Sequence, residues 1–400
     1  MMKTSVLIFT DLEYGGVVSA LINLLKALNR RLISVTVRAP YPFGPRYAEV
    51  AQLVDVEPIS LTEFQSCLVG YRMPKNPLRS VIYRAIRKLL SIFSTRNRNL
   101  RYQVALRQLL SPSHEHYDSA WDFLGYGKLT TALATAVNAT KKATWIHSTD
   151  IGFMGQAAQY YKSFDRIFCV SKAVREKVIR QYPRLADKTT VLYNLIDTQT
   201  IIGHASQPLN DNRYEGSHRI LTIARLAPEK GIDLAVQAAA LLKKHGVRFH
   251  WFVLGEGVQH QRLSAMIAQL QLTDSFSLLG NVGNPYNYLK RSTIYVQPSR
   301  NEGYGITLSE AIIMDKPIIA TDIPAFREQI SNGINGILTS LDPADLANCI
   351  EMLLSHPELS RQFEKALQSS TMDFSDSLQK IYDFLDIPRA ALEKNDHIDE

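Results

Sequence analysis

Residues 294–311 read IYVQPSRNEGYGITLSEA, and this stretch is the strongest indication of the fold in the sequence. Residues 294–297 (IYVQ) have the character of a buried strand, and a helix is expected over 306–314. Gly303 and Gly305 lie between the two, where glycine permits a tight turn whose backbone N–H groups stay accessible. The stretch therefore predicts a strand–turn–helix unit whose helix N-terminus favours an anion.

The same alternation of short apolar runs with helical patterns extends outward from this stretch over most of the chain. Strands are expected at 5–10, 34–38, 120–124, 143–147, 165–171, 190–193, 219–224, 249–254, 275–279, 294–297 and 317–321. Helices of about 10–15 residues lie between many of them, which is typical of parallel sheets covered on both faces. The pattern lapses between 197 and 218, where polar residues with Pro208 and Gly216 indicate an interdomain linker.

Length and composition agree with two domains. The chain of 400 residues exceeds one ordinary core, and its 46% hydrophobic and 21% charged residues exclude the disordered, collagen and coiled-coil classes. We predict an α/β protein of two Rossmann-like, doubly wound parallel-sheet domains that face each other across a cleft. Their expected bounds are 1–200 and 215–372, with a C-terminal helix at about 375–392 packing back on the first domain.

Cysteine usage and hydropathy predict the cellular setting. The three cysteines are widely separated and form no CxxC pair, which argues against a disulfide framework and a structural zinc site. No apolar run approaches the roughly 20 residues of a membrane span, and the run at 6–9 is too short for a signal peptide. The sequence therefore predicts a cytoplasmic protein, with peripheral association at the inner face of the membrane as an option.

The net charge of +7 is concentrated in one segment, residues 71–110. This segment holds ten basic residues and no Asp or Glu, so removing it leaves 35 basic against 38 acidic residues, a net charge of −3. Such a local cationic segment concerns the partners of the protein rather than its fold. Nucleic acid is excluded as a partner, because no aromatic platform or DNA-reading motif accompanies the cations.

A helical stripe runs through the basic segment. Its apolar members share one face and the cations lie elsewhere around the helix; the apolar members are Leu78, Ile82, Ala85, Ile86, Leu89 and Phe93. Such a helix fits an anionic membrane surface with its apolar face immersed. Two alternatives stay open: the apolar face packs on the first domain with solvated arginines, or the cations bind an anionic acceptor such as a lipid diphosphate or an acidic glycan.

Charged residues follow two of the expected strands in the second domain. Glu302 and Glu310 flank the glycine turn, where carboxylates accept hydrogen bonds from hydroxyls and so suit a polyol beside a phosphate, as in a nucleotide sugar. Arg225 and Lys230 follow the strand at 219–224, where two cations can clamp a diphosphate and stabilise it as a leaving group. The alternatives are a solvated Glu at an ordinary strand–turn–helix junction and solvated surface cations.

In their order along the chain, these features resemble the retaining glycosyltransferases of family 4, which have the GT-B fold. The residues and motifs that carry the resemblance are Gly15-Gly16, Val170-Ser171, Asn194 with Asp197, Arg225 with Lys230-Gly231, Gly255-Glu256-Gly257, and Glu302 with Glu310. The sequence departs from the family at Ala224, where glycine is usual, and at 193–197, which lacks the usual Pro and Gly. The resemblance covers most of the chain.

The resemblance implies a role for each matching residue. The donor diphosphate is bound by Arg225 and Lys230, the donor sugar lies against Glu302, and the nucleotide ribose is bound by Glu310. The donor-binding residues expected on this basis are Gly15, Gly16, Arg225, Lys230, Gly255, Glu256, Gly303, Tyr304, Gly305, Ile306, Thr307 and Glu310. The family needs no divalent metal and no other cofactor, and the sequence contains no DxD or HExxH motif.

The first domain adds three candidates. His147 ends the strand expected at 143–147, where it would donate a hydrogen bond to a sugar hydroxyl or contact the acceptor; the alternative is a satisfied strand-end histidine. Asp11 and Asp150 are candidates for binding acceptor hydroxyls. The catalytic candidates of the whole chain are Glu302, His147, Arg225 and Lys230.

The sequence thus predicts a retaining, metal-independent transferase that moves a hexose from a nucleotide diphosphate sugar, with UDP as the expected nucleotide. The acceptor is expected to be a glycan or lipid-linked, in the synthesis of cell-surface polysaccharide or glycolipid. No nucleophile is evident, which favours front-face displacement guided by the leaving phosphate over a covalent intermediate. Two other functions stay open: a nucleotide-sugar 2-epimerase of the same architecture, and a non-catalytic partner subunit of a transferase.

Overall fold

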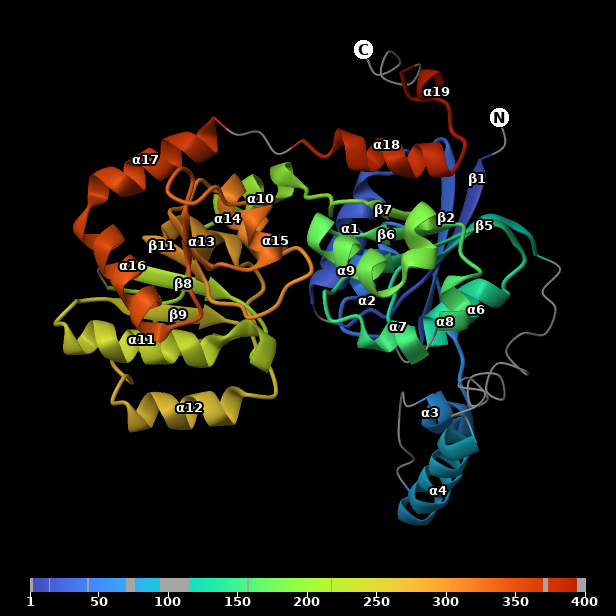
Figure 1. Cartoon of the computed structure of the whole chain (residues 1–400), viewed down its shortest axis with the longest axis horizontal. Helices are drawn as coiled ribbons and strands as arrows, with labels where there is room; N and C mark the ends of the chain where they lie inside the picture. Colours follow the sequence, from blue (N-terminus) through green and yellow to red (C-terminus); the bar gives the residue numbers. More distant parts are fainter. Residues whose placement is uncertain are drawn as a thin grey trace. The chain divides into compact units, whose positions relative to one another are not determined.

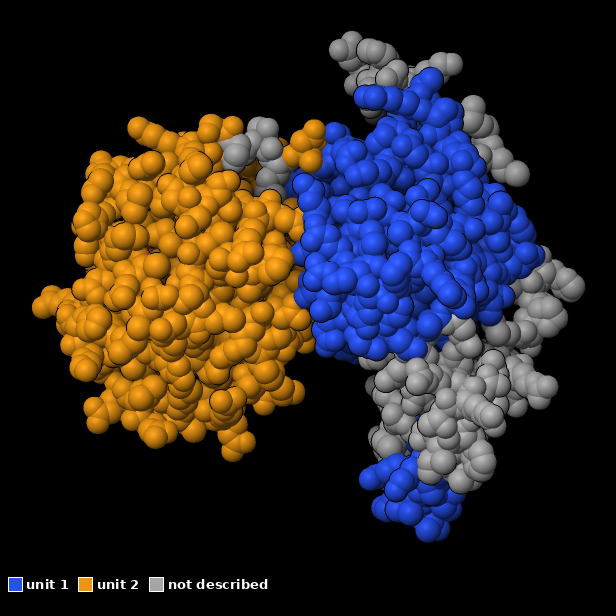
Figure 2. All heavy atoms as spheres, viewed as in Figure 1, with its two compact units in different colours: residues 1–195, 374–400 blue, residues 196–373 orange. Residues whose placement is uncertain are grey.

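The computed structural model of the chain describes residues 3–13, 15–41, 43–69, 76–93, 115–127, 129–156, 158–216, 218–369 and 373–393. The chain forms two compact units, coloured separately in Figure 2. Unit 1 contains Met1–Leu195 and Phe374–Glu400, and unit 2 contains Ile196–Asp373. Each unit is an α/β fold built on its own parallel sheet (Figure 1).

Unit 1 is built on a parallel sheet with, among the described residues, seven strands in the order β3-β2-β1-β4-β5-β6-β7. The strands are β1 (Thr4–Phe9), β2 (Ile33–Pro40), β3 (Asp55–Ile59), β4 (Tyr117–Asp122), β5 (Ala139–Ile146), β6 (Arg166–Cys169) and β7 (Thr189–Val191). Residues 6–9 of β1 are all buried, which is typical of a parallel sheet covered by helices. Phe9 lies opposite Arg38 of β2 and Asp122 of β4, so these strands end at one edge.

The helices of unit 1 connect or follow its strands. They are α1 (Gly16–Ala27), α2 (Tyr47–Ala51), α3 (Glu63–Val69), α4 (Pro77–Phe93), α6 (Leu129–Ala136), α7 (Gly152–Gln156), α8 (Ala158–Tyr161), α9 (Lys172–Gln181), α18 (Ser375–Phe384) and α19 (Arg389–Glu393). Ser171 caps α9, and its hydroxyl oxygen accepts a hydrogen bond from the N–H of Val174 (3.1 Å). After unit 2 the chain returns, and α18 packs on unit 1 with the ring of Phe384 5.7 Å from that of Phe168.

Unit 2 is built on a second parallel sheet, with six strands within the described ranges in the order β10-β9-β8-β11-β12-β13. The strands are β8 (Arg219–Ile223), β9 (His250–Leu254), β10 (Phe276–Gly280), β11 (Ile294–Gln297), β12 (Ile318–Thr321) and β13 (Ile337–Thr339). The helices are α10 (Thr198–Ala205), α11 (Ile232–Lys244), α12 (His260–Gln269), α13 (Tyr286–Arg291), α14 (Ile306–Ile313), α15 (Pro324–Arg327), α16 (Pro343–Ser355) and α17 (Pro357–Gln368). Two buried clusters form the core, one on each face of the sheet, because alternate side chains such as Trp251 and Phe252 point to opposite sides.

The described part of the stretch expected to be a linker, residues 197–216 and 218, is structured instead. Asp197 caps helix α10 by accepting a hydrogen bond from the N–H of Thr200 (3.0 Å), and Tyr214 packs in the core of unit 2. The linker prediction is therefore wrong. The prediction fails because this stretch combines a polar cap, a short helix and several turn-forming residues, and together they have the amino-acid composition of a loop.

Two strands lie outside the sequence-based expectation. β3 (DVEPI) carries two acidic residues and Pro58, which an edge strand tolerates because it pairs on one side only, with β2. β13 (ILT) is also an edge strand and has three residues. Short polar edge strands carry little apolar periodicity, so patterning does not find them.

Helix α4 contains the described part of the basic segment; residues 71–75 and 94–110 of that segment lie outside the described residues. In Figure 1, α3 and α4 project from the sheet of unit 1 as a pair. Leu78 and Ile82 of the expected apolar stripe are exposed, so the alternative in which this stripe packs on the first domain is wrong for them. Where the chain is described, no helix combines the length and the apolar character needed to cross a membrane.

Candidate active site

The strand order of unit 2 places a topological switch point between β8 and β11. The two strands are neighbours, with Ile220 opposite Ile294, but the chain leaves β8 through α11 toward β9 and leaves β11 through α14 toward β12. Ligands of doubly wound sheets bind at the carboxyl ends of the strands at such a point. The two loops that follow β8 and β11 carry Arg225, Lys230 and Glu302.

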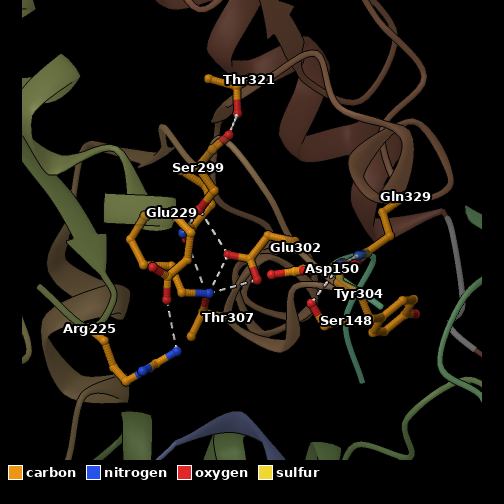
Figure 3. A network of polar contacts seen from close by, with 12 residues as sticks. Ser148, Asp150, Arg225, Glu229, Ser299, Glu302, Tyr304, Thr307, Thr321 and Gln329 are labelled. Atoms are coloured by element: carbon orange, nitrogen blue, oxygen red, sulfur yellow. Dashed lines mark hydrogen bonds and ion pairs between the residues drawn. The ribbon is translucent and has the colours of Figure 1, made fainter. Parts of the chain in front are cut away.

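Glu302 and Lys230 form an ion pair at this edge. Lys230 Nζ lies 2.8 Å from Oε1 and 2.7 Å from Oε2 of Glu302, and the Lys and Glu side chains are 17% and 10% exposed. The hydroxyl of Ser299 donates a further hydrogen bond to Glu302 Oε1 (2.8 Å; Figure 3). Both carboxylate oxygens thus accept hydrogen bonds, and the carboxylate is held in one orientation. Sequence reasoning places both charged residues here but does not foresee that they pair.

Buried polar side chains of β11 support Ser299. Gln297 Nε2 donates to Ser299 Oγ (2.9 Å), and Gln297 Oε1 accepts hydrogen bonds from the hydroxyls of Tyr295 and Thr307. The hydroxyl of Thr321 at the end of β12 donates to the Ser299 carbonyl (Figure 3). Burial raises the pKa of Tyr295, so its hydroxyl keeps its proton and remains a donor. Sequence reasoning misses this chain of hydrogen bonds, although two polar residues at the end of an apolar strand are a signal for it.

The loop that carries Lys230 is fixed against the loop that follows β11. Gly231 has φ 65°, and a Cβ there would lie 1.9 Å from the carbonyl oxygen of Pro298, so this approach requires glycine. The N–H of Arg300 donates to the carbonyl of Glu229 (2.8 Å). The cation and the carboxylate of the central pair therefore stand on two loops that are joined to each other.

Arg225 is more exposed than Lys230. Its Nη2 donates to Glu229 Oε1 (3.0 Å; Figure 3), and its side chain is 59% exposed. An exposed ion pair of this kind contributes little to stability and exchanges readily for a stronger anion. Arg225 can therefore turn to a phosphate, whereas Lys230 would share its three N–H donors between Glu302 and a ligand.

Helix α14 begins at Ile306, four residues after Glu302. Gly305 caps the helix with φ 92°, and a Cβ at this position would lie 2.6 Å from the ring of Phe326. The N–H groups of the first turn, which include Ile306 and Thr307, have no acceptor within the helix itself. This helix N-terminus at the switch point is suited to an anion, as the sequence predicts.

Tyr304 and Glu310, on either side of this helix N-terminus, are both buried. Gln329 Nε2 donates to the Tyr304 carbonyl (2.6 Å; Figure 3), and burial raises the pKa of Tyr304 to about 12, so its side chain is neutral. Glu310 Oε1 accepts a hydrogen bond from the hydroxyl of Tyr286 (2.9 Å). Tyr286 lies in α13, and no local sequence pattern connects it with Glu310.

The turn after β9 supports the turn after β8. A Cβ at Gly255 would lie 2.1 Å from the carbonyl oxygen of Ala224, and the Glu256 carbonyl accepts a hydrogen bond from the N–H of Leu226 (3.0 Å). The Glu256 side chain lies 2.9 Å from His260 Nδ1. Close backbone packing thus accounts for the glycine, and donor contacts by Gly255 and Glu256 stay a prediction.

In unit 1 the switch point lies between β1 and β4, and His147 follows β5 at the same edge. His147 Nε2 lies 2.7 Å from the carbonyl oxygen of Phe123. A carbonyl can only accept, so Nε2 carries the proton and Nδ1 is an acceptor. Burial lowers the pKa of His147 to about 4, so the ring is neutral at physiological pH. The expectation that His147 donates to a sugar hydroxyl is therefore reversed: its Nδ1 can only accept from one.

Asp122, the last residue of β4, holds the loop that positions His147. Its Oδ2 accepts hydrogen bonds from the hydroxyls of Thr131 (2.5 Å) and Thr144 (3.0 Å), and its Oδ1 accepts one from the N–H of Gly125 (3.2 Å). Asp122 is fully buried, and this burial raises its pKa. Sequence reasoning misses Asp122, although a carboxylate at the end of an apolar strand is a signal that buried donors surround it.

The other candidates of unit 1 lie near the same edge. Gly15 caps α1 with φ 138°, Gly16 is the first residue of that helix, and Asp11 follows β1 and is half-buried. Asp150 is exposed, and its Oδ1 accepts a hydrogen bond from the N–H of Gly152 (3.3 Å) within a local turn. Their contacts with donor or acceptor stay predictions. Over the described ranges, no three His, Cys, Asp or Glu side chains are grouped as metal ligands.

Two family models match the chain. The model described as Glycosyltransferase Family 4 matches residues 14–200, and the model described as Glycosyl transferases group 1 matches residues 207–369. The first match contains His147 and Asp122 at the edge of unit 1. The second contains the Lys230–Glu302 pair and the whole switch point of unit 2.

Individual proteins agree with this class. The chain is 25% identical over 215 residues to an uncharacterized glycosyltransferase of Methanocaldococcus jannaschii. The aligned region covers 53% of this chain and 54% of the relative. It is 26% identical over 234 residues to the N-acetylgalactosamine-N,N'-diacetylbacillosaminyl-diphospho-undecaprenol 4-alpha-N-acetylgalactosaminyltransferase of Campylobacter jejuni. This aligned region covers 58% of this chain and 60% of the relative. The chain spans about half the length of the curated relatives it matches.

A solved structure extends the agreement to the fold of both units. Anabaena Alr3699/HepE in complex with UDP and glucose has a TM-score of 0.73 at 18% identity, over 96% of this chain and 99% of that one. At this identity the similarity concerns the fold alone, two Rossmann-like parallel-sheet domains. The two family models cover the candidate residues of both units, and the chain belongs to the group 1 glycosyltransferases of family 4, with the GT-B fold.

Proposed function

We propose that the chain is a retaining hexosyltransferase that uses a nucleotide diphosphate sugar, with UDP as the nucleotide, and needs no metal ion. Its acceptor is a glycan or lipid-linked, in cell-surface polysaccharide or glycolipid synthesis on the cytoplasmic side of the membrane. The observation that carries the proposal is the Lys230–Glu302 pair beside the N-terminus of α14 at the switch point of unit 2. The UDP bound by the Anabaena protein and the diphospho-undecaprenol named for the Campylobacter relative support the donor and acceptor classes.

The leaving group explains the cations. Transfer breaks the bond between the anomeric carbon and a diphosphate oxygen, and the electron pair stays on the diphosphate. Lys230, Arg225 and the first-turn N–H groups of α14 stabilise the negative charge that develops there. Because Gly231 and Gly305 hold these donors on rigid turns, they need little rearrangement during the reaction. They thereby take the place that a metal ion would otherwise fill.

Glu302 orients the donor sugar and stabilises positive charge at its anomeric carbon. Its oxygens already accept hydrogen bonds from Lys230 and Ser299, which reduces their power as nucleophiles. This supports front-face displacement rather than a glycosyl-enzyme intermediate. The acceptor hydroxyl forms its bond to the anomeric carbon from the side of the leaving diphosphate and gives its proton to a diphosphate oxygen, so the anomeric configuration is retained.

Hydroxyl groups of the substrates are bound by acceptors on both units. Glu310, held by Tyr286, accepts hydrogen bonds from the ribose hydroxyls. His147 Nδ1 accepts one from a sugar hydroxyl, because its Nε2–H is already used by a carbonyl. Asp11 and Asp150 bind acceptor hydroxyls, and Gly15 and Gly16 at the N-terminus of α1 contribute to donor binding.

Calorimetric titration with several UDP-sugars, followed by transfer assays, tests the proposal. Lys230→Ala is expected to weaken donor binding or turnover at least ~100-fold, on the scale of one lost transition-state contact. The matched control is Lys243→Ala, because Lys243 also pairs with a carboxylate, that of Asp274 (3.0 Å), but at the far end of α11. Wild-type transfer by Lys230→Ala would contradict the site.

The stereochemistry and the metal requirement are tested separately. NMR of the product is expected to show the anomeric configuration of the donor, and the rate is expected to be unchanged by EDTA. An inverted product contradicts front-face displacement, and a rate restored only by added Mg²⁺ or Mn²⁺ contradicts metal independence.

A further inference from the structure

Helix α4 presents apolar side chains to solvent. Leu78, Val81 and Ile82 are 70%, 63% and 46% exposed. Their spacing of three and four residues places them on one face of the helix, and we call them the apolar ridge. Large exposed apolar side chains that gather on one helix face mark an interaction surface, unlike apolar residues scattered singly over a protein.

The opposite face of α4 is already covered within unit 1. Ser80 is 4% exposed, and the ring of Tyr83 packs edge-on against Phe64 of α3, with centroids 5.2 Å apart. At 3.6 residues per turn, Ser80 and Tyr83 lie roughly 140–200° around the helix axis from Leu78. The apolar ridge therefore points away from α3, on a helix pair that projects from the sheet (Figure 1).

Basic residues flank the apolar ridge on both sides. On the same helical projection, Arg79 lies beside the ridge on one side, and Arg84 and Lys88 lie on the other. The guanidinium of Arg84 also donates hydrogen bonds to Ser80 Oγ from Nε (3.1 Å) and Nη2 (2.7 Å). Arg79 pairs with Glu63 of α3 (3.1 Å), but both side chains are largely exposed, so the pair exchanges readily for another anion. The basic segment 71–110 itself contains no Asp or Glu.

We propose that the apolar ridge docks on an anionic lipid surface, with its apolar side chains at the headgroup–acyl boundary and its cations on lipid phosphates. An amphipathic helix whose apolar stripe has cations along both flanks is the arrangement that lies in a membrane interface. Charge complementarity selects this occupant over a second copy of the chain, because two such ridges would bring like charges together. The docking goes beyond the transfer reaction: it holds the protein on the surface that contains a lipid-linked acceptor.

Vesicle sedimentation of the full chain tests the docking. The wild-type protein is expected to bind phosphatidylcholine vesicles that contain phosphatidylglycerol, and to be released by added salt because the Debye length shortens. The triple substitution Leu78→Gln/Val81→Gln/Ile82→Gln is expected to weaken binding at least ~10-fold, since the buried apolar area supplies much of the affinity. Arg84→Gln/Lys88→Gln is expected to weaken it about fivefold per cation lost.

A matched control shows whether the loss of binding is specific to the apolar ridge or follows from replacing any exposed apolar side chains by Gln. Val258 and Ile334 of unit 2 are 90% and 61% exposed, and Val258→Gln/Ile334→Gln is expected to bind vesicles like the wild type. Thermal shift with a UDP-sugar shows whether each variant is folded and binds donor. Three results would overturn the docking. The wild-type protein could bind neutral and anionic vesicles equally, or the triple variant could bind anionic vesicles like the wild type. The third result is self-association of the wild-type protein that the triple variant abolishes. Vesicle binding by a chain that binds no nucleotide sugar would support it, while contradicting the proposed transfer.

Discussion

The carboxyl edges of the two sheets differ in the charge state of their polar side chains. In unit 2 the charged side chains at the edge pair with one another, Lys230 with Glu302 and Arg225 with Glu229. In unit 1 the ring of His147 is neutral and bound to a carbonyl, and the side chain of Asp122 is buried. Two sheets of the same class thus present different polar groups at their edges: paired ions in unit 2, and in unit 1 a neutral ring with an acceptor nitrogen.

Glu302 and Asp122 are both acidic residues near the end of a strand, β11 and β4 respectively, but their surroundings differ. Glu302 accepts hydrogen bonds from a charged Lys and a Ser at the rim of the edge. The hydrogen bonds described for Asp122 come from neutral donors that are themselves enclosed, the hydroxyls of Thr131 and Thr144 and the N–H of Gly125. Removing Glu302 leaves a cation that can reach water, whereas removing Asp122 leaves buried donors that cannot. The first carboxylate is therefore available for function, and the second is structural.

The largest predicted effect comes from substituting these two carboxylates by alanine. Asp122→Ala is expected to lower the free energy of unfolding of unit 1 by about 3 kcal/mol, because three buried donors lose their acceptor. Glu302→Ala is expected to cost about 2 kcal/mol in unit 2, since a charged hydrogen-bond network at a largely buried pair is lost, but at least ~100-fold in transfer rate. Calorimetric unfolding and transfer assays of both variants measure the two quantities. A stable Asp122→Ala protein, or an active Glu302→Ala protein, would remove the distinction.

The sequence predicts the two ends of the central pair because each lies within a few residues of a strand end. Lys230 follows β8 and Glu302 follows β11, and parallel strands bring such residues to one edge. The contacts between residues far apart in sequence are different. The hydrogen bond from Tyr286 to Glu310 depends on how α13 packs beside α14, and no periodicity in either helix encodes it.

For helix α4, too, the sequence predicts the local structure but not the tertiary contacts. Apolar periodicity predicts the helix and its stripe, which the structure places in α4. Which face of α4 is covered is decided by Phe64 of α3, in a segment whose helix the periodicity does not reveal. The neutral state of His147 is likewise beyond sequence reasoning, because it follows from the enclosure of the ring.

Two capping glycines provide the next comparison. Gly305 and Gly15 cap the helices that begin at the two switch points, both with positive φ. A Cβ at Gly305 would lie 2.6 Å from the Phe326 ring, whereas a Cβ at Gly15 would meet, beyond its chain neighbours, no described atom within 4 Å. Gly305→Ala is therefore expected to cost about 2 kcal/mol and to weaken donor binding, and Gly15→Ala about 1 kcal/mol from backbone strain alone.

Thermal unfolding and donor titration of both variants measure these effects. Gly231→Ala serves as a second test in unit 2, since a Cβ there would meet the Pro298 carbonyl oxygen at 1.9 Å. Equal losses for Gly15→Ala and Gly305→Ala would mean that close packing does not distinguish the two edges.

The smallest predicted effect is the pH dependence that His147 gives to unit 1. Its folded pKa of about 4 lies below the ordinary value of 6.5, so between these values the unfolded chain binds more protons than the folded one. The stabilisation by neutral His147 is therefore complete above about pH 6.5 and is lost as the pH falls toward 4. Because the enclosed ring still keeps part of its surface in contact with water, we expect roughly 1 kcal/mol over this range.

His147→Gln keeps an N–H donor for the Phe123 carbonyl but does not titrate, so its unfolding temperature is expected to fall less than that of the wild type between pH 6.5 and 4. His245→Gln is the matched control, because His245 lies 39% exposed on unit 2 and touches only a surface carboxylate, that of Glu351, among the contacts described. If His147→Gln retains the wild-type slope, the ring is protonated in the folded protein. It would then donate from both nitrogens, and the edge of unit 1 would bind an anion as the edge of unit 2 does.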